Sequence, residues 1–203
     1  AEARLFLATD ERGRDAGRIA AIDNACREEI DGKRVAFFGF FESFDDLDIA
    51  RTLFTAAEAW LRGRGFAVVH GPVSPSTNHE CGCLVAGFDR PPKLLMAYNP
   101  AYYGRLIEAC GYRGVQDLVA CEAAIDGTVP GRIVRAEEVF RKRRAFTIRP
   151  VDLRRFDAEV EKLHLIYNES WSSNYGFVPL SREEIGWFAR ELRPIIHPDL
   201  CRF

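Results

Sequence analysis

A proline-rich loop behind a buried strand carries an amide, an imidazole and a carboxylate in succession. These groups are Asn78, His79 and Glu80, at the end of the segment Gly71–Glu80. A loop in this place lies at the carboxyl end of the sheet, where α/β folds bind ligands. An imidazole beside a carboxylate is a pairing that general acid–base catalysis uses. In the alternative interpretation, Asn78 and Glu80 only hold the loop in shape by hydrogen bonds to its backbone.

Three tyrosines lie within six residues around the start of a predicted short helix, at Tyr98, Tyr102 and Tyr103. A tyrosine packs an apolar ring and still presents a hydroxyl group, and Asn99 adds an amide to the same run. Either the cluster packs at the edge of the core or one of its members faces a ligand. If the chain has a ligand pocket, we expect Tyr98, Asn99 and Tyr103 to line it together with the loop above.

The cysteines offer one candidate metal site. Cys81 and Cys83 are closely spaced and His79 stands two residues earlier, but no second pair follows at the spacing of a zinc site. We expect ordinary reduced thiols and no bound metal, because reduced cysteines are the default in a cytoplasmic protein.

The composition excludes several classes of protein. The chain has 203 residues, of which 28 are basic and 30 acidic, so its net charge of −2 predicts no general affinity for nucleic acid. No apolar run approaches the roughly 20 residues that span a bilayer, and no signal-peptide core follows the N-terminus. The basic run Arg141–Arg144 could attract phosphates, but no aromatic residues are interleaved with it. We therefore expect a cytoplasmic protein without membrane or nucleic-acid partners.

Hydrophobic periodicity predicts the elements that position these residues. A hairpin precedes a continuously apolar central strand, in which Gly39 indicates a bulge or a close backbone approach. A helix then leads to another buried strand, and such short connections imply a parallel strand pair. The predicted strands are 4–9, 18–22, 35–41, 66–70 and 116–124, and the predicted helices are 46–62 and 100–110.

The second half of the chain predicts a new unit that is incomplete. A basic linker over residues 128–144 leads to a strand at 145–149, two helices, and the start of another strand at 200–203. The second helix begins with Ser181 and Glu184 at the spacing of a reciprocal capping box.

The order of elements, with the segments Arg18–Asn24, Gly71–Pro75 and Tyr98–Tyr103, resembles the GNAT superfamily of acyl-CoA N-acyltransferases. The resemblance implies an α/β fold with a GNAT-like mixed sheet flanked by helices, followed by the first half of a second GNAT-like unit. The implied domains are a degenerate GNAT-like domain at 1–127, the linker at 128–144 and the incomplete domain at 145–203. The chain would then be an internal piece of a longer tandem protein. The apolar faces of residues 146–203 would lack their own sheet and would have to pack on the first domain or on another chain, for example in a homo-oligomer.

The resemblance also implies a reaction, in which an acyl group passes from acetyl-CoA or another acyl-CoA to a small-molecule amine. Glu80 or His79 would take the proton of the amine. Tyr103 would serve as the acid, because Ile107 occupies the position where the family has its tyrosine. The loop between the last two helices would border the acceptor pocket, and it contributes Trp171, Asn174 and Tyr175. These side chains could equally dock the two domains together.

One turn departs from the family pattern. The family binds the pyrophosphate of acyl-CoA with a glycine-rich turn at a helix N-terminus, where bare backbone amides face the anion. Here that turn is Glu42–Asp48, which has no glycine and four carboxylates. We expect weak binding of acetyl-CoA or none. The alternative function is a non-catalytic GNAT-like module that binds a small ligand or a partner protein.

Overall fold

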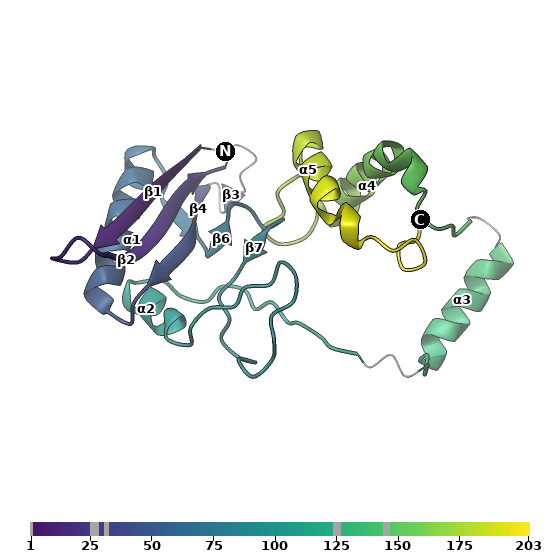
Figure 1. Ribbon diagram of the computed structural model, residues 1–203, viewed down its shortest axis with the longest axis horizontal. Coiled ribbons are helices and arrows are strands. Elements are labelled where there is room, and N and C mark those ends of the chain that lie inside the picture. The colour runs from purple at the N-terminus through teal and green to yellow at the C-terminus, as the bar shows by residue number, and fades with distance from the viewer. Residues whose placement is uncertain (1, 25–28, 31–32, 124–126, 144–146) are drawn as a thin grey trace. The chain divides into compact units, whose positions relative to one another are not determined.

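The computed structural model describes residues 2–24, 29–30, 33–123, 127–143 and 147–203. The chain forms two compact units. The first comprises Ala1–Leu118 and Trp171–Pro179, and the second Val119–Ser170 and Leu180–Phe203. The first unit contains a sheet with helices and the second is mainly helical (Figure 1). The predicted α/β class with a mixed sheet is confirmed.

A five-stranded mixed sheet forms the centre of the first unit. The strands run in the order β1-β2-β4-β3, and β5 also pairs with β4. They are β1 (Glu2–Thr9), β2 (Asp15–Asp23), β3 (Glu29–Ile30), β4 (Lys33–Ser43) and β5 (Val68–His70). The β4–β5 pair is parallel, with Val35 opposite Val68, whereas the other described pairs are antiparallel. A parallel pair requires a crossover, and the helix α1 provides it as predicted.

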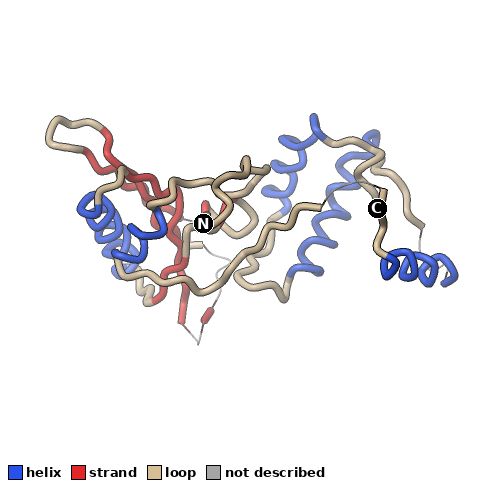
Figure 2. Tube along the Cα trace, turned by 90° about the horizontal axis from the view of Figure 1, so that it is seen from below, coloured by secondary structure: helices blue, strands red, loops and turns tan. Residues whose placement is uncertain are grey.

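Helix α1 (Leu47–Gly63) covers one face of this sheet (Figure 2). Asp46 caps its first turn, and Leu53, Phe54 and Leu61 are buried against the strands. The ring of Phe54 meets the ring of Phe38 edge to face at 5.0 Å. Burying a side chain of this size stabilises the fold by about 1.5–3 kcal/mol, so this layer holds the unit together.

The other face of β4 is covered by two segments that are distant in sequence. Val35 and Phe37 pack there against Val73 of β6 (Val73–Ser74) and against Val178. The strand β6 pairs with β7 (Glu80–Cys81). Coverage on both faces explains why the sequence of β4 is apolar without alternation, as the sequence predicted.

An extra residue bulges β4 where it passes β6. Ala20 is opposite Gly39 and Arg18 is opposite Glu42, so three steps along β4 match two along β2. Phe40 takes the uncommon positive φ of 51°. A β carbon on Gly39 would lie 2.1 Å from the carbonyl oxygen of Val73. The predicted bulge and the predicted close approach are both present.

The second unit contains α3 (Gly131–Arg143), α4 (Phe156–Trp171) and α5 (Arg182–Leu192), with short 3-10 turns at Leu153–Arg155 and Arg193–Ile195. Trp171, the last residue of α4, belongs to the first unit. The capping box of Ser181 and Glu184 at the start of α5 is confirmed. Helix α3 lies within the segment expected as a linker, and its described side chains are all exposed.

Two predicted strands differ from the structure. The segment Gln116–Ala124 forms no strand over its described part, because no neighbouring strand pairs with it and Leu118 and Val119 are exposed. Of the predicted strand at 145–149, residues 145 and 146 lie outside the described residues, and 147–149 form no regular strand. Instead, Pro150 forms an isolated antiparallel bridge with Arg202.

Helix α2 (Tyr103–Ala109) confirms the predicted short helix, although it begins three residues later and ends one residue earlier than predicted.

Candidate functional site

The first unit contains a cavity of about 250 Å³ beside the bulge of β4. Its wall combines ionisable groups with aromatic rings and prolines. The lining residues are Arg18, Phe40, Phe41, Glu42, Pro72, Ser74, Glu80, Gly82, Cys83, Ala97, Tyr98, Asn99, Pro100 and Tyr103. The cavity therefore brings the end of β4 together with the two segments that the sequence analysis singled out.

Tyr103 and Glu42 form the closest polar pair in this wall. The Tyr103 hydroxyl donates to Oε2 of Glu42 at 2.6 Å, and the backbone N–H of Ser43 donates to the same hydroxyl at 3.1 Å. Burial raises the pKa of Tyr103, and the hydrogen bond to Glu42 raises it further. Tyr103 therefore keeps its proton at neutral pH and acts as a hydrogen-bond donor to the carboxylate.

Glu42 is positioned by the bulge. Its carboxylate lies 3.7 Å from the guanidinium of Arg18 on β2, opposite it in register. Phe40, next to the bulge, uses its backbone N–H to donate to Oγ of Ser74 at 2.9 Å. The bulge is thereby tied to β6, and Glu42 is directed at the cavity that Glu80 of β7 also lines.

Tyr98 and Asn99 line the cavity, but their polar atoms are used by the loop itself. The Tyr98 hydroxyl donates to the carbonyl of Phe88 at 3.0 Å. Asn99 accepts from the N–H of Leu84 at 2.7 Å and donates to its carbonyl at 3.2 Å. These side chains hold the loop that forms one wall.

Asn78 and His79 do not line the cavity. The Asn78 amide donates to the carbonyl of Val178 at 2.7 Å, and the ring of His79 meets the hydroxyl of Ser76 at 3.1 Å. Thr77 donates to the carbonyl of Gly176 at 2.7 Å. This part of the loop anchors the segment Trp171–Pro179. Asn78 thus makes a structural hydrogen bond to backbone, which is the alternative interpretation of this residue, although its partner lies in a distant segment and not in the loop itself.

Trp171, Asn174 and Tyr175, predicted to border the acceptor, do not line the cavity either. They lie in the segment that Thr77 and Asn78 hold. The ring of Tyr175 stacks on His70 with 6.2 Å between ring centroids. Trp171 and Tyr175 are about half exposed, at 49% and 52%.

The N-terminus of α1 does not fit a pyrophosphate. Asp46 fills it with its own carboxylate, which accepts from the N–H groups of Asp48 at 2.8 Å and Ile49 at 3.3 Å. Asp45 pairs with Arg105. A phosphate group would displace one carboxylate and meet two others, so the amides that bind an anion in such turns are already occupied.

The sequence analysis missed Arg18, Glu42 and Cys83 as cavity residues. Burial raises the pKa of the Cys83 thiol, which makes it a poor nucleophile. Glu42 carried a usable signal: a carboxylate that directly follows a buried strand behind a bulge lies at the same sheet edge as the loop with Glu80.

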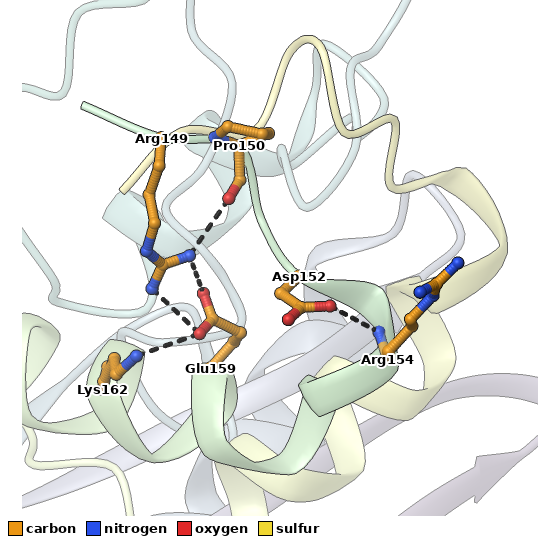
Figure 3. Close-up of polar contacts among 6 residues, drawn as sticks. All are labelled: Arg149, Pro150, Asp152, Arg154, Glu159 and Lys162. Atoms are coloured by element: carbon orange, nitrogen blue, oxygen red, sulfur yellow. Dashed lines mark hydrogen bonds and ion pairs between the residues drawn. The ribbon is translucent and has the colours of Figure 1, made fainter. Parts of the chain in front are cut away.

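A second polar cluster, also missed, lies in the second unit (Figure 3). Glu159 of α4 is only 4% exposed and accepts two hydrogen bonds from Arg149, at 2.8 and 2.9 Å, and one from Lys162 at 3.0 Å. The hydrogen bonds from Arg149, with a smaller contribution from Lys162, lower the pKa of Glu159 to about 2. Arg149 also donates to the carbonyl of Pro150. The cluster fastens the segment at Arg149 and Pro150 to α4.

The described part of the chain contains neither a metal-binding cluster nor a membrane-spanning helix. No three His, Cys, Asp or Glu side chains there are arranged to hold a metal ion, the triplet of His79, Cys81 and Cys83 included. No described helix is both long and apolar enough to cross a bilayer.

The sequence is similar to two longer bacterial proteins. It is 39% identical over all of its length to "Bacterial ceramide synthase" of Caulobacter vibrioides (strain NA1000 / CB15N), of which it covers 53%. It is 33% identical over 93% of its length to "Protein YghO" of Escherichia coli (strain K12), of which it covers 48%. The chain thus spans about half the length of these relatives. No protein-family model matches it.

Among solved structures, the chain is similar to a protein from Pyrococcus furiosus with a provisional assignment as an acetyl transferase. The TM-score is 0.39 at 19% identity, over 61% of this chain and 67% of that one. A score this low does not establish a shared fold.

Proposed function

We propose that this chain is part of an enzyme that transfers an acyl group to an amine, with the amine bound in the cavity beside the β4 bulge. The observation that carries the proposal is the 39% identity, over the whole chain, to a protein named as a ceramide synthase. A ceramide is the amide of a fatty acid and a long-chain amino alcohol, so its synthesis includes formation of an amide bond. The GNAT resemblance of the sequence supports the same reaction class.

The charges of the cavity suit an amine. Among the described residues that line it, Glu42 and Glu80 outnumber the single cation, Arg18, and attract an ammonium group. An amine must lose a proton before it attacks an acyl carbon, and a nearby carboxylate accepts that proton. In this proposal Glu80 and Glu42 are the proton acceptors. The raised pKa of Tyr103 makes its hydroxyl a weak acid, which keeps its proton. In this proposal Tyr103 therefore orients Glu42 by donating a hydrogen bond to it.

Neighbouring tyrosines provide a matched test. Acyl transfer from a labelled acyl thioester to a long-chain amine is followed by mass spectrometry of the amide. Glu42→Gln and Tyr103→Phe should each slow transfer by about 100-fold, in the range of general-base effects. Tyr102→Phe is the control, because the Tyr102 hydroxyl donates to the carbonyl of Ser43 and does not line the cavity. Equal losses in Tyr102→Phe and Tyr103→Phe would contradict the assignment.

The acyl donor is bound without help from the start of α1. Acyl-CoA, the donor that the resemblance implies, carries a pyrophosphate that the Asp46-capped turn does not fit. Acetyl-CoA and the acetyl thioester of N-acetylcysteamine, which lacks phosphates, should therefore bind within about threefold of each other in calorimetry, since the phosphates add no favourable contact. Micromolar binding of acetyl-CoA, with much weaker binding of the N-acetylcysteamine thioester, would contradict this expectation.

The same turn favours the alternative of a non-catalytic module that binds an amine or a partner protein. In that case Glu42→Gln weakens amine binding, while neither the wild-type chain nor the full-length protein forms an amide.

A further inference from the structure

An apolar rim borders the cavity, formed by Leu94, Leu95, Met96 and Leu118. Their exposed fractions are 66%, 48%, 42% and 69%. The run Leu94–Met96 continues directly into Ala97 and Tyr98, which line the cavity. Leu118 approaches from another segment, because a β carbon on the lining residue Gly82 would lie 3.7 Å from its Cδ1. Two separate segments thus place exposed apolar side chains beside the same cavity.

Leu94, Leu95 and Met96 of the rim lie on a loop that side-chain hydrogen bonds hold in shape. Asn99 makes two hydrogen bonds to the backbone of Leu84, and Tyr98 makes one to Phe88. Single exposed leucines are ordinary on a protein surface, whereas contiguous ones mark binding sites. A site held in place before its ligand arrives loses less entropy on binding, which raises the affinity.

The rim and the cavity together define the ligand. In the part of the chain that the structure describes, the cavity presents two carboxylates, Glu42 and Glu80, against one guanidinium, that of Arg18. A molecule that suits both surfaces has a cationic head and an apolar tail. We propose that the rim binds the alkyl tail of a long-chain amine whose ammonium group enters the cavity. This inference rests on the proposed function in taking the cavity as the amine site, and it adds where the tail lies.

Calorimetry on the 203-residue chain tests the tail and the head separately, below the concentrations at which the probes form micelles. Each methylene tightens binding about fourfold when fully buried, the equivalent of about 0.8 kcal/mol. An open rim that buries half of the six extra methylenes should make decylamine bind about 60 times more tightly than butylamine. Decanoate, with the same tail and a negative head, should bind no more tightly than butylamine, because the carboxylates repel it.

Two double variants locate the tail. L94S/M96S removes two rim side chains and should weaken decylamine binding about tenfold, with butylamine changed less than twofold. L5S/L7S is the matched control, since Leu5 and Leu7 of β1 are similarly exposed, at 73% and 61%, and do not line the cavity. It should leave both affinities within twofold of the wild type.

Three outcomes would overturn the inference. The first is equal affinity for butylamine and decylamine, and the second is an equal loss of decylamine affinity in the two double variants. The third is Leu94-dependent binding of the chain to phosphatidylcholine vesicles in the absence of amine, which would assign the rim to a bilayer. The proposed function fails separately: if decylamine binds as expected but the full-length protein acylates neither amine, the rim stands and the reaction is wrong.

Discussion

The two units of this chain are stabilised in different ways. The first has a dense apolar core, in which Phe37, Phe38 and Phe54 are at most 2% exposed. The second has few buried apolar residues, such as Ile185 of α5, and its most buried charged group is Glu159. The first unit thus relies on apolar layers on both faces of β4, whereas the second has a smaller apolar core to which the hydrogen bonds of one buried carboxylate are added.

This difference explains why the candidate site lies in the first unit. A site needs side chains fixed by packing, and the ring of Tyr103, whose hydroxyl donates to Glu42, lies 5.1 Å from the buried ring of Phe41. In the second unit, Leu163, Ile166 and Trp187 are exposed. Its helices are therefore less tightly packed and hold the side chains of a potential site less firmly.

The largest expected effect separates the two cores. Phe38→Ala should destabilise the first unit by about 3–5 kcal/mol, because it leaves a cavity between β4 and α1. Ile185→Ala in the second unit should cost about 2 kcal/mol, since its surroundings are open and collapse more readily. Denaturation followed by the fluorescence of single-tryptophan variants, Trp60 for the first unit and Trp187 for the second, measures both. Equal costs would show that the second unit is as tightly packed.

A smaller effect distinguishes two neighbours in one loop of the first unit. Asn78→Ala should lower stability by about 1–3 kcal/mol, because it leaves the carbonyl of Val178 without its donor. Glu80→Ala should change the melting temperature little, since Glu80 is exposed, yet weaken amine binding. Thermal melts with calorimetry of decylamine test the pair. A large drop in melting temperature with Glu80→Ala would instead assign Glu80 to holding the loop.

The smallest effect is expected in the polar cluster of the second unit, because Arg149 and Lys162 are partly exposed and water screens their charges. The pKa of Glu159 falls from its ordinary 4.5 to about 2 on folding. The folded state therefore binds this proton less readily than the unfolded chain. The resulting stability is complete above about pH 4.5 and is lost as the pH falls towards 2.

Acid titration of Trp187 fluorescence should show this loss, and Glu159→Gln should remove it from that pH window. Glu161→Gln, at an exposed position of the same helix, is the control. An unchanged acid transition in Glu159→Gln would contradict the role of the cluster.

The sequence by itself determined the local elements. The apolar run of β4 predicted a strand buried on both faces, the spacing of Leu53, Ala57 and Leu61 predicted α1, and Gly39 marked the close approach. These features follow from side-chain periodicity and backbone freedom over a few residues, which a sequence displays directly. The strand at 116–124 failed because its apolar residues had no partner strand, which periodicity does not reveal.

The tertiary structure alone decided which groups share the site. Glu42 and Tyr103 are 61 residues apart, and Asn78 reaches Val178 across 100 residues. It also decided that Asn78, an attractive amide in the sequence, serves the backbone, whereas Glu42, which the sequence analysis counted only as an obstacle to phosphate, faces the cavity. Residue types state which hydrogen bonds a side chain can make. The partner it finds depends on which distant segments the packed core brings within reach.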